Sequence, residues 1–209
     1  MKKTAIVIGA TGLVGSHIAD LLLDDERYST VKVFHRRSTG IRHRKLEEYI
    51  IDFDKIETWC NQLTGDELYS AMGTTIRKAG SKEAQYKIDV TYPLKVAEAA
   101  ASNGVKKYSL VSSAGADKDS KLFYPRIKGE LDEAVKKLSF DRITIMRPSI
   151  LEGDRQESRP GYRFGEGLTL SFRLDNLLNE RYREHLSRVE NRDAPMPGRN
   201  LNVMMRWEF

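Results

Sequence analysis

A glycine-rich turn near the start of the chain constrains the fold more than any other feature of the sequence. It follows the short apolar run 5–8 and precedes a helical pattern over residues 15–23. A strand-to-helix turn needs glycine for a tight bend, for close approach of backbone N–H groups to a pyrophosphate, and for packing of the helix against the strand. The helix N-terminus then offers free N–H groups and a positive dipole end to the phosphates. We therefore predict a dinucleotide-binding turn rather than a ligand-free one, with the cofactor-binding residues Gly9, Thr11, Gly12, Leu13, Val14 and Gly15.

Beyond this turn, short β-branched runs alternate with longer helical patterns through the first 150 residues. Strands that alternate with helices of about ten residues or more imply crossover connections and a parallel sheet. The sequence therefore predicts an α/β fold, a Rossmann-type doubly wound parallel sheet, over residues 1–161. The predicted strands cover 5–9, 31–34, 67–72, 108–112 and 142–147, and the predicted helices cover 15–23, 59–63, 89–101 and 123–138.

The pattern changes after about residue 161. Leu168, Leu170 and Phe172 alternate with polar residues, and a similar alternation runs through 201–209. Apolar residues at every second position predict strands with one apolar and one polar face, unlike the continuous apolar runs of the first part. Residues 162–209 are therefore predicted to form a short β-rich C-terminal appendage to the 1–161 domain.

The composition argues against several classes of protein. The 209 residues carry a net charge of +5, but the charges are mixed and no basic stripe with interleaved aromatic residues is present, so no nucleic-acid partner is expected. The apolar run 5–8 is too short for a signal-peptide core or a membrane span. The single cysteine, Cys60, allows no intramolecular disulfide and no thiolate metal cluster, and it fits a reducing compartment. We expect a cytoplasmic protein without a metal site.

The residues after the second predicted strand bear on the choice of cofactor. An acidic residue there would accept hydrogen bonds from a ribose 2′-hydroxyl, as in NAD binding. The chain instead has Arg36 and Arg37, followed by Ser38 and Thr39. Cations and hydroxyls at that place suit a 2′-phosphate, so the sequence favours NADP(H) over NAD(H). The alternative is that these are exposed arginines in a loop.

Two further segments follow strands of the same predicted sheet. Asp52 and Phe53 stand where a third strand should end, which in such folds lies near the adenine. Gly73, Thr74 and Thr75 follow the next strand, where small residues let the backbone approach the cofactor. Both segments are predicted to bind the cofactor.

Serine, tyrosine and lysine form the candidate catalytic set. Tyr124 and Lys128 are four residues apart in a helical pattern, so both side chains project from one face. Ser112, a candidate cofactor contact, and Ser113 end the preceding strand at the edge that carries the glycine turn. Carbonyl reduction by NADPH needs a proton donor near the carbonyl oxygen, which a phenol beside an ammonium supplies while a serine hydroxyl orients the carbonyl. The alternative is a helix whose tyrosine packs and whose lysine is solvated.

Several segments, in this order, resemble one branch of a known family. They are residues 9–15, 72–75, 112–117, 124–130, 147–149 and 153–161. Together they resemble the atypical short-chain dehydrogenase/reductases of the Tat-interactive protein branch, over residues 1–161. The resemblance implies an NADP-binding Rossmann fold with Ser113, Tyr124 and Lys128 as the reductase triad. It also implies that Arg147, Pro148 and Ser149 lie near the nicotinamide, and it supplies no substrate.

The C-terminal region has a different resemblance. Segments 172–182 and 195–200, with the alternating terminal strand that ends in Phe209, resemble the last strands of TonB-dependent outer-membrane receptors. A barrel needs many closed strands, so this region spans no membrane by itself. The resemblance implies a reductase truncated near residue 161 and joined to the end of a receptor; an ordinary β-appendage over the active site is the alternative. Its apolar faces need burial, on the domain or by self-association.

Three hypotheses on function follow from these patterns. The leading one is an NADP(H)-dependent oxidoreductase of the short-chain dehydrogenase type, which transfers hydride to or from a small carbonyl or alcohol substrate. The second is a non-catalytic NADP-binding regulatory or partner-binding module. The third is a fragment of a TonB-dependent receptor fused to a truncated reductase.

Overall fold

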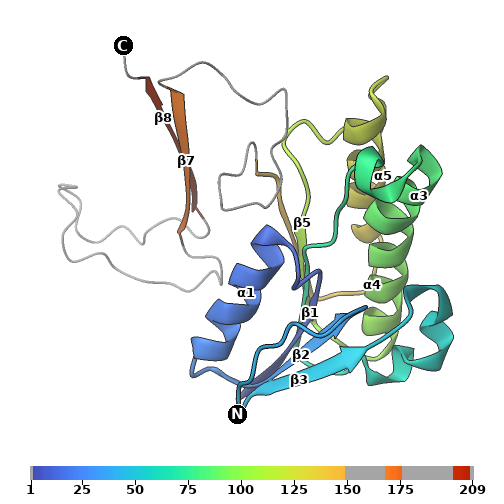
Figure 1. Cartoon of the computed structure of the whole chain (residues 1–209), viewed down its shortest axis with the longest axis vertical. Coiled ribbons are helices and arrows are strands. Elements are labelled where there is room, and N and C mark those ends of the chain that lie inside the picture. Colours follow the sequence, from blue (N-terminus) through green and yellow to red (C-terminus); the bar gives the residue numbers. More distant parts are fainter. Residues whose placement is uncertain (1, 149–167, 176–199, 208–209) are drawn as a thin grey trace. The chain divides into compact units, whose positions relative to one another are not determined.

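The computed structural model describes residues 2–148, 168–175 and 200–207 (Figure 1). The chain divides into two compact units, Met1–Ser149 and Ile150–Phe209. Among the described residues, the first unit contains a six-stranded sheet with flanking helices and the second contains a two-stranded sheet.

The six strands of the first unit are all parallel, in the order β3-β2-β1-β4-β5-β6. The order reverses between β1 and β4, so the sheet is doubly wound and its switch point lies beside the glycine turn. The predicted α/β fold is therefore confirmed. The strands are β1 Lys3–Ile8, β2 Tyr28–His35, β3 Leu46–Ile50, β4 Glu67–Ser70, β5 Lys107–Val111 and β6 Arg142–Met146.

Helices cover both faces of this sheet. Figure 1 shows α1 (Leu13–Asp24) on one side, and α4 (Tyr92–Ser102) and α5 (Phe123–Val135) on the other. Ile6 and Ile8 of β1 share a buried apolar cluster with residues of α4 and α5, because alternate residues of a strand face opposite sides of the sheet. The remaining helices are η1 Phe53–Thr58, η2 Cys60–Gln62, α2 Ile76–Ala79, α3 Lys82–Tyr86 and η3 Lys87–Thr91.

The helical segment before β5 begins earlier than the sequence predicts. Instead of starting at Asp89, it runs without a break from α3 through the π-helical turn η3 into α4. Ser81 caps its start, since the Ser81 hydroxyl accepts a hydrogen bond from the Ala84 N–H at 3.1 Å. The helix predicted at 59–63 is shorter than expected and consists of the 3-10 turn η2.

Three glycines allow β1, α1 and the end of β4 to meet closely. Gly9 has a φ of +85°, and a Cβ at this position would lie 2.6 Å from the backbone of Ala71. A Cβ at Gly15 would lie 2.1 Å from the Gly9 oxygen, so α1 begins directly against the turn. The Gly12 N–H donates to the Gly9 carbonyl at 3.0 Å and closes the turn. At positions 9 and 15, any other residue would displace backbone.

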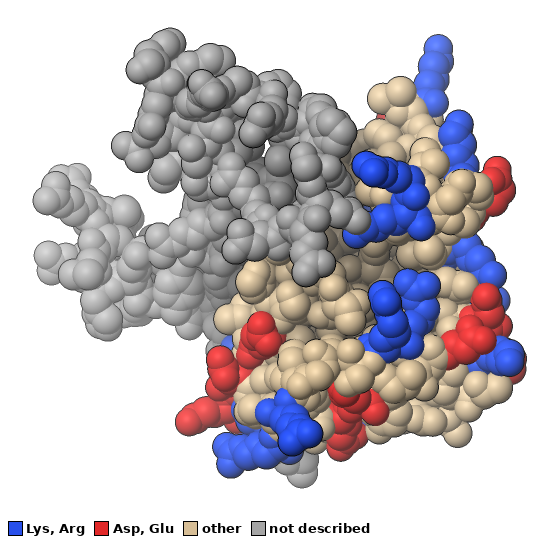
Figure 2. Space-filling view, viewed as in Figure 1, with Lys and Arg blue, Asp and Glu red and all other residues tan. Residues whose placement is uncertain are grey.

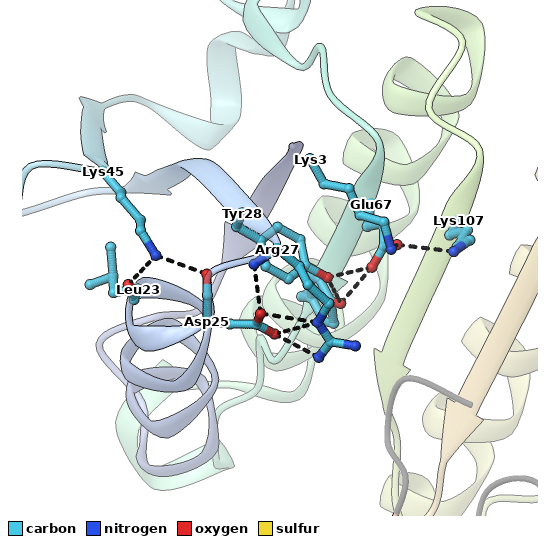
Figure 3. A network of polar contacts seen from close by, with 9 residues as sticks. Lys3, Leu23, Asp25, Arg27, Tyr28, Lys45, Glu67 and Lys107 are labelled. Carbon is cyan, nitrogen blue, oxygen red and sulfur yellow. Dashed lines mark hydrogen bonds and ion pairs between the residues drawn. The ribbon is translucent and has the colours of Figure 1, made fainter. Parts of the chain in front are cut away.

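The opposite, amino edge of the sheet is held by one buried carboxylate (Figure 3). Glu67 accepts hydrogen bonds from the hydroxyls of Tyr28 and Tyr69, both at 2.7 Å. Its other oxygen lies 3.0 Å from Lys107 Nζ and 3.1 Å from Lys3 Nζ. Burial raises the pKa of Glu67, but these contacts outweigh that effect and lower the pKa to about 2. A single carboxylate thus joins the amino ends of four strands.

The second unit contains one antiparallel pair of strands. They are β7 (Leu168–Asp175) and β8 (Asn200–Trp207), with Leu168 opposite Trp207. Both strands fall where the sequence alternates between apolar and polar residues. Segment 153–161 and most of the segments that resemble receptors lie outside the described residues.

We expect the stability of the protein to depend on pH through Glu67. Its folded-state pKa of about 2 lies below the ordinary value of 4.5, so the stabilisation is present above pH 4.5 and is lost as the pH falls toward 2. Glu67→Gln should lower the free energy of unfolding by about 3 kcal/mol at pH 6 and by only about 1 kcal/mol at pH 3. Urea unfolding followed by circular dichroism measures both values. Glu57→Gln, which changes an exposed glutamate, is the control. If the loss of unfolding free energy in Glu67→Gln is the same at both pH values, the lowered pKa of Glu67 is contradicted.

A second prediction concerns the glycine turn. Gly9 and Gly104 share a φ of +85°, but nothing lies within 4 Å of a Cβ at Gly104. Gly104→Ala should therefore lower the free energy of unfolding by about 1 kcal/mol, because the left-handed conformation alone disfavours alanine. Gly9→Ala should cost about 3 kcal/mol, because its Cβ also overlaps the backbone of Ala71. Chemical unfolding of the two variants tests this, and equal losses would show that the close contact at Gly9 is unimportant.

Candidate functional site

All six strands of the first unit end at one edge, and backbone hydrogen bonds extend the sheet just beyond them. The Ala71 N–H donates to the Ile8 carbonyl at 3.0 Å, and the Ser112 N–H donates to the Met146 carbonyl at 2.7 Å. In open α/β sheets, ligands bind beyond this edge where the strand order reverses. The segments that the sequence predicts as cofactor-binding each follow a strand or lie in the glycine turn at this edge.

The glycine turn has the chemistry that a pyrophosphate requires. Gly12 is the N-cap of α1, and no side chain caps the helix there. The N–H groups of Leu13 and Val14 therefore have no acceptor within the helix. Thr11 and Gly12 are exposed, so the helix end is open to an anion. These residues fit a dinucleotide, whose phosphates would accept the N–H bonds and gain from the positive helix end.

The connection from β2 to β3 is basic, and its described residues form no helix. Arg36 and Arg37 are exposed directly after β2. The hydroxyls of Ser38 and Thr39 both donate to the carboxylate of Glu48 in β3. Glu48 thus engages the two hydroxyls that the sequence suggests as partners of a 2′-phosphate. The cationic groups for such a contact are the two arginines.

Contacts at both ends fix this connection in place. Lys45 Nζ donates to the carbonyls of Leu23 and Asp25, at 2.7 and 2.8 Å, where α1 ends (Figure 3). At the other end, His35 Nε2 lies 3.4 Å from Glu48 Oε1. Burial lowers the pKa of His35, and Glu48 opposes that effect. The arginines thus belong to a segment that is anchored on α1 and on β3.

The segment after β3 is only partly available to a cofactor. Asp52 is exposed and caps η1, because its carboxylate accepts a hydrogen bond from the Asp54 N–H at 3.0 Å. Phe53 is buried, stacks on Tyr92 and meets Trp59 edge-on. Because the Phe53 ring belongs to the core, any contact with an adenine must come from its backbone.

The turn after β4 is held by side chains of α3 and η3, which follow α2 in the chain. Gly73 is exposed, and Thr75 is the N-cap of α2. The Thr74 N–H donates to Asp89 Oδ1 at 2.7 Å, and the Thr74 carbonyl accepts from Gln85 Nε2 at 3.1 Å. Two buried side chains thus fix the backbone of this predicted cofactor-binding turn.

Tyr124 and Lys128 lie one helical turn apart on α5 and differ sharply in exposure. Tyr124 is 43% exposed, whereas Lys128 is only 2% exposed. The alternative of a packed tyrosine and a solvated lysine is therefore wrong. Burial lowers the pKa of Lys128, and the carboxylates of Asp89 and Asp132 raise it. A phenol open to solution near a buried ammonium is an arrangement that can transfer a proton.

The end of β6 is tied to α5 and to the loop after β5. Arg147 donates to the fully buried Asp132 on α5, from Nε at 2.9 Å and from Nη2 at 2.8 Å. The Pro148 carbonyl accepts from the Ala114 N–H at 2.7 Å. Ser149 lies outside the described residues. Arg147 therefore has a structural partner in addition to the nicotinamide contact that the family resemblance implies.

The two serines after β5 lie in different surroundings. Ser112 is buried, and its Oγ has no hydrogen-bond partner among the described residues. Ser113 is half-buried and donates to the Ala114 carbonyl at 3.2 Å. A Cβ at Gly129 would lie 2.2 Å from Lys118 N, so α5 packs directly on the loop that follows the serines. The helix that carries Tyr124 thus also positions this loop.

Four residues that shape this edge were not predicted from the sequence: Gln85, Asp89, Gly129 and Asp132. A signal for three of them is present in the sequence. Gln85 and Asp89 are four residues apart, as are Lys128 and Asp132, so each pair lies on one helical face. Polar pairs at this spacing, on helices that otherwise turn apolar residues inward, indicate a buried polar network. Gly129 has no comparable signal, because its role depends on a loop packed against it.

The charge of +5 is not gathered in one place on the face drawn in Figure 2, where lysine and arginine side chains lie among aspartate and glutamate. Within the part of the chain that the structure describes, no helix combines the length and apolar character that crossing a membrane requires.

Relatives of known sequence match most of the chain. The "Protein fmp52, mitochondrial" of Aspergillus niger is 42% identical over 163 residues, which cover 74% of this chain and 69% of the relative. The protein HTATIP2 of Rattus norvegicus is 36% identical over 164 residues, which cover 77% of this chain and 67% of the relative. These matches support the predicted resemblance to the Tat-interactive protein branch.

Solved structures of several enzymes share the fold. The UDP-glucose 4-epimerase of Thermotoga maritima matches with a TM-score of 0.56 and 19% identity, over 69% of this chain and 54% of that one. The Bordetella bronchiseptica enzyme WbmG, solved with NAD, matches with a TM-score of 0.59 and 13% identity, over 70% of this chain and 53% of that one. The chain thus matches about half the length of these structures, and at such identities the likeness concerns the fold.

The comparisons bear on two expectations from the sequence. The cytoplasmic location is contradicted, because the fungal relatives are named as mitochondrial proteins. The reason for the error is that one cysteine and a short apolar run carry little information on location. The resemblance of residues 168–209 to TonB-dependent receptors has no support from these comparisons.

The sequence profile of the NAD dependent epimerase/dehydratase family matches residues 5–161. This range includes the glycine turn, the basic connection, Tyr124 and Lys128. The family match agrees with the six-stranded parallel sheet and with the solved structures that share it. The chain therefore belongs to the NAD dependent epimerase/dehydratase family, whose members have an NAD(P)-binding Rossmann domain of the short-chain dehydrogenase/reductase type.

Proposed function

We propose that the protein is an NADP(H)-dependent oxidoreductase that transfers hydride to or from a small carbonyl or alcohol substrate. One observation carries the proposal: Lys128 is buried one helical turn from the exposed Tyr124, at the same sheet edge as the glycine turn. A solvated lysine and a packed tyrosine would argue for a merely structural helix. The observed exposures are the reverse, as proton transfer to a substrate requires.

Each residue has a distinct role in the proposed reaction. When bound, NADPH supplies the hydride that adds to the carbonyl carbon. The Tyr124 hydroxyl donates its proton to the carbonyl oxygen, which gives the alcohol, and the exposed phenolate regains a proton from solvent. The ammonium of Lys128 stabilises the phenolate and binds the nicotinamide ribose, while Ser113 orients the carbonyl group. Oxidation of an alcohol uses the same steps in reverse.

The preference for NADP(H) rests on Arg36 and Arg37. They are exposed at the end of β2, where an acidic residue would favour the free 2′-hydroxyl of NAD. The anchored connection presents two guanidinium groups, which bind phosphate through paired hydrogen bonds. We propose that they bind the 2′-phosphate and that NAD(H) binds more weakly for lack of it.

Loss of the Tyr124 hydroxyl should abolish turnover without preventing cofactor binding. With a panel of small aldehydes and ketones, Tyr124→Phe should lower kcat by about 100-fold to 10,000-fold, because the proton donor is absent. NADPH oxidation followed by absorbance gives kcat, and NADPH fluorescence gives the dissociation constant. Tyr86→Phe, which also removes the hydroxyl of an exposed tyrosine, should retain activity. No NADPH binding by the wild type at high micromolar concentration would refute the proposed function; binding without turnover of any carbonyl would favour a non-catalytic module.

The cofactor preference can be tested with two matched pairs of arginines. Replacing both Arg36 and Arg37 by alanine should weaken NADPH binding by about 10-fold to 100-fold, the effect of losing one charged hydrogen-bonding group or more. NADH binding should change little, since it lacks the 2′-phosphate. The double alanine variant of Arg42 and Arg44, which are exposed in the same connection, is the control. Equal weakening of NADPH and NADH binding would contradict the proposed preference.

A further inference from the structure

Glu48 is a half-buried carboxylate on β3 that accepts three hydrogen bonds from the turn after β2. Its Oε2 accepts from the Ser38 hydroxyl at 2.7 Å, and its Oε1 accepts from the N–H of Thr39 at 2.8 Å and from the Thr39 hydroxyl. His35 Nε2, at the end of β2, lies 3.4 Å from the same Oε1. Donors from two consecutive residues thus converge on one side chain of the neighbouring strand.

The two hydroxyls extend the influence of Glu48 to the backbone that follows. The Gly40 N–H donates to Ser38 Oγ at 3.1 Å, and the Ile41 N–H donates to Thr39 Oγ1 at 3.2 Å. Each hydroxyl therefore donates to the carboxylate and accepts from the backbone two residues further on, as in other short turns of this kind. A Cβ at Gly40 would meet no atom within 4 Å, so close packing does not hold the turn at that point. Hydrogen bonds that begin at Glu48 hold it instead.

Arg36 and Arg37 stand in the chain between two fixed points. On one side is His35, the buried last residue of β2, and on the other is Ser38, which is bound to Glu48. Fixing the backbone of a residue in one conformation costs free energy. A segment that is ordered before its ligand arrives does not pay this cost on binding, so the ligand binds more tightly.

The negative charge of Glu48 has an effect of the opposite sign. Burial raises the pKa of Glu48, but the hydrogen bonds from Thr39 and Ser38 outweigh that effect and lower the pKa, so the group is ionised near neutral pH. A carboxylate in the connection that would receive a phosphate repels that phosphate. Water and salt screen such a repulsion at the protein surface, and three donors already offset the charge. We therefore expect the ordering of the turn to outweigh the repulsion.

We infer that Glu48 is a positioning residue for the cofactor preference: it orders the turn after β2 and so holds Arg36 and Arg37 where they bind the 2′-phosphate. The inference rests on the proposed function, because the two arginines matter here as the phosphate-binding groups. Glu48 itself does not contact the cofactor in this assignment. In the opposite assignment, Glu48 occupies the hydroxyls of Ser38 and Thr39 and competes with the phosphate for them. The two assignments predict opposite signs for the effect of removing Glu48.

Glu48→Ala distinguishes the two assignments. The dissociation constants of NADPH and NADH are measured with the full chain by fluorescence. Glu48→Ala should weaken NADPH binding by about 10-fold, because the turn is no longer ordered before binding, and should change NADH binding by less than about twofold. Glu47→Ala, which changes the exposed neighbouring glutamate of β3, should alter neither constant. Tighter NADPH binding by Glu48→Ala, or equal weakening of both cofactors, would overturn the inference.

Two further variants test whether Glu48 acts through the turn. Glu48→Gln keeps an acceptor oxygen for Thr39, and its amide can donate to Ser38 Oγ, so NADPH binding should stay within about threefold of the wild type. The double variant Ser38→Ala with Thr39→Val should weaken NADPH binding as much as Glu48→Ala does. Combining all three substitutions should cause no further loss, because they remove the same contact. Additive losses would show that the hydroxyls bind the cofactor by themselves, and would refute the inference.

The order of the turn is also measured without cofactor, by NMR-detected hydrogen exchange of the amides of Thr39, Gly40 and Ile41. Exchange should be about 10-fold faster or more in Glu48→Ala than in the wild type, and unchanged in Glu47→Ala. If the wild type binds no NADPH, the proposed function and this inference both fail. If the wild type binds NADPH more tightly than NADH and Glu48→Ala keeps that preference, the proposed function stands and the inference on Glu48 is refuted.

Discussion

The backbone contact between Gly9 and Gly15 is the constraint on which the remainder of the site depends. The start of α1 lies so close to the turn that a Cβ at Gly15 would fall 2.1 Å from the Gly9 oxygen. That approach directs the N-terminus of α1 to the sheet edge beside β1 and β4, where the strand order reverses. The same turn presses against Ala71, so the end of β4 is fixed by it as well. The proposed phosphate binding at this edge would thus follow from how tightly one helix packs on one strand.

Much of the fold could be predicted because the information is local. A parallel strand that is buried on both faces reads as a continuous apolar run, and β1 has such a run. β4 is harder to predict from the sequence, because it begins with Glu67, a charged residue that disfavours a strand. The structure shows why it is tolerated: two tyrosine hydroxyls and two lysines satisfy the carboxylate. Three of these partners, Lys3, Tyr28 and Lys107, come from other strands and are invisible to a local pattern.

The site was only partly predictable for the same reason. Residue types and spacing pointed to Tyr124 and Lys128, but their unequal exposure depends on the helices packed around α5. Asp89 looked like the first residue of a helix, because nothing local indicates that a π turn continues from α3. The hydroxyls of Ser38 and Thr39 were expected to face a cofactor, and their engagement by Glu48 follows from the pairing of β2 with β3. In each case a contact across elements decided the role.

Hydrogen-bonded and unpartnered buried polar groups lie near opposite edges of the parallel sheet. At the amino edge, the carboxylate of Glu67 has a partner for each of its oxygens. Near the carboxyl edge, Ser70 Oγ, Asp89 Oδ2, Ser112 Oγ and Asp132 Oδ1 are buried without hydrogen-bond partners among the described residues. Unsatisfied groups of this kind favour any ligand or segment that can complete their hydrogen bonds. The two edges can therefore change independently: groups at the carboxyl edge can be replaced while Glu67 goes on joining the amino ends of the strands.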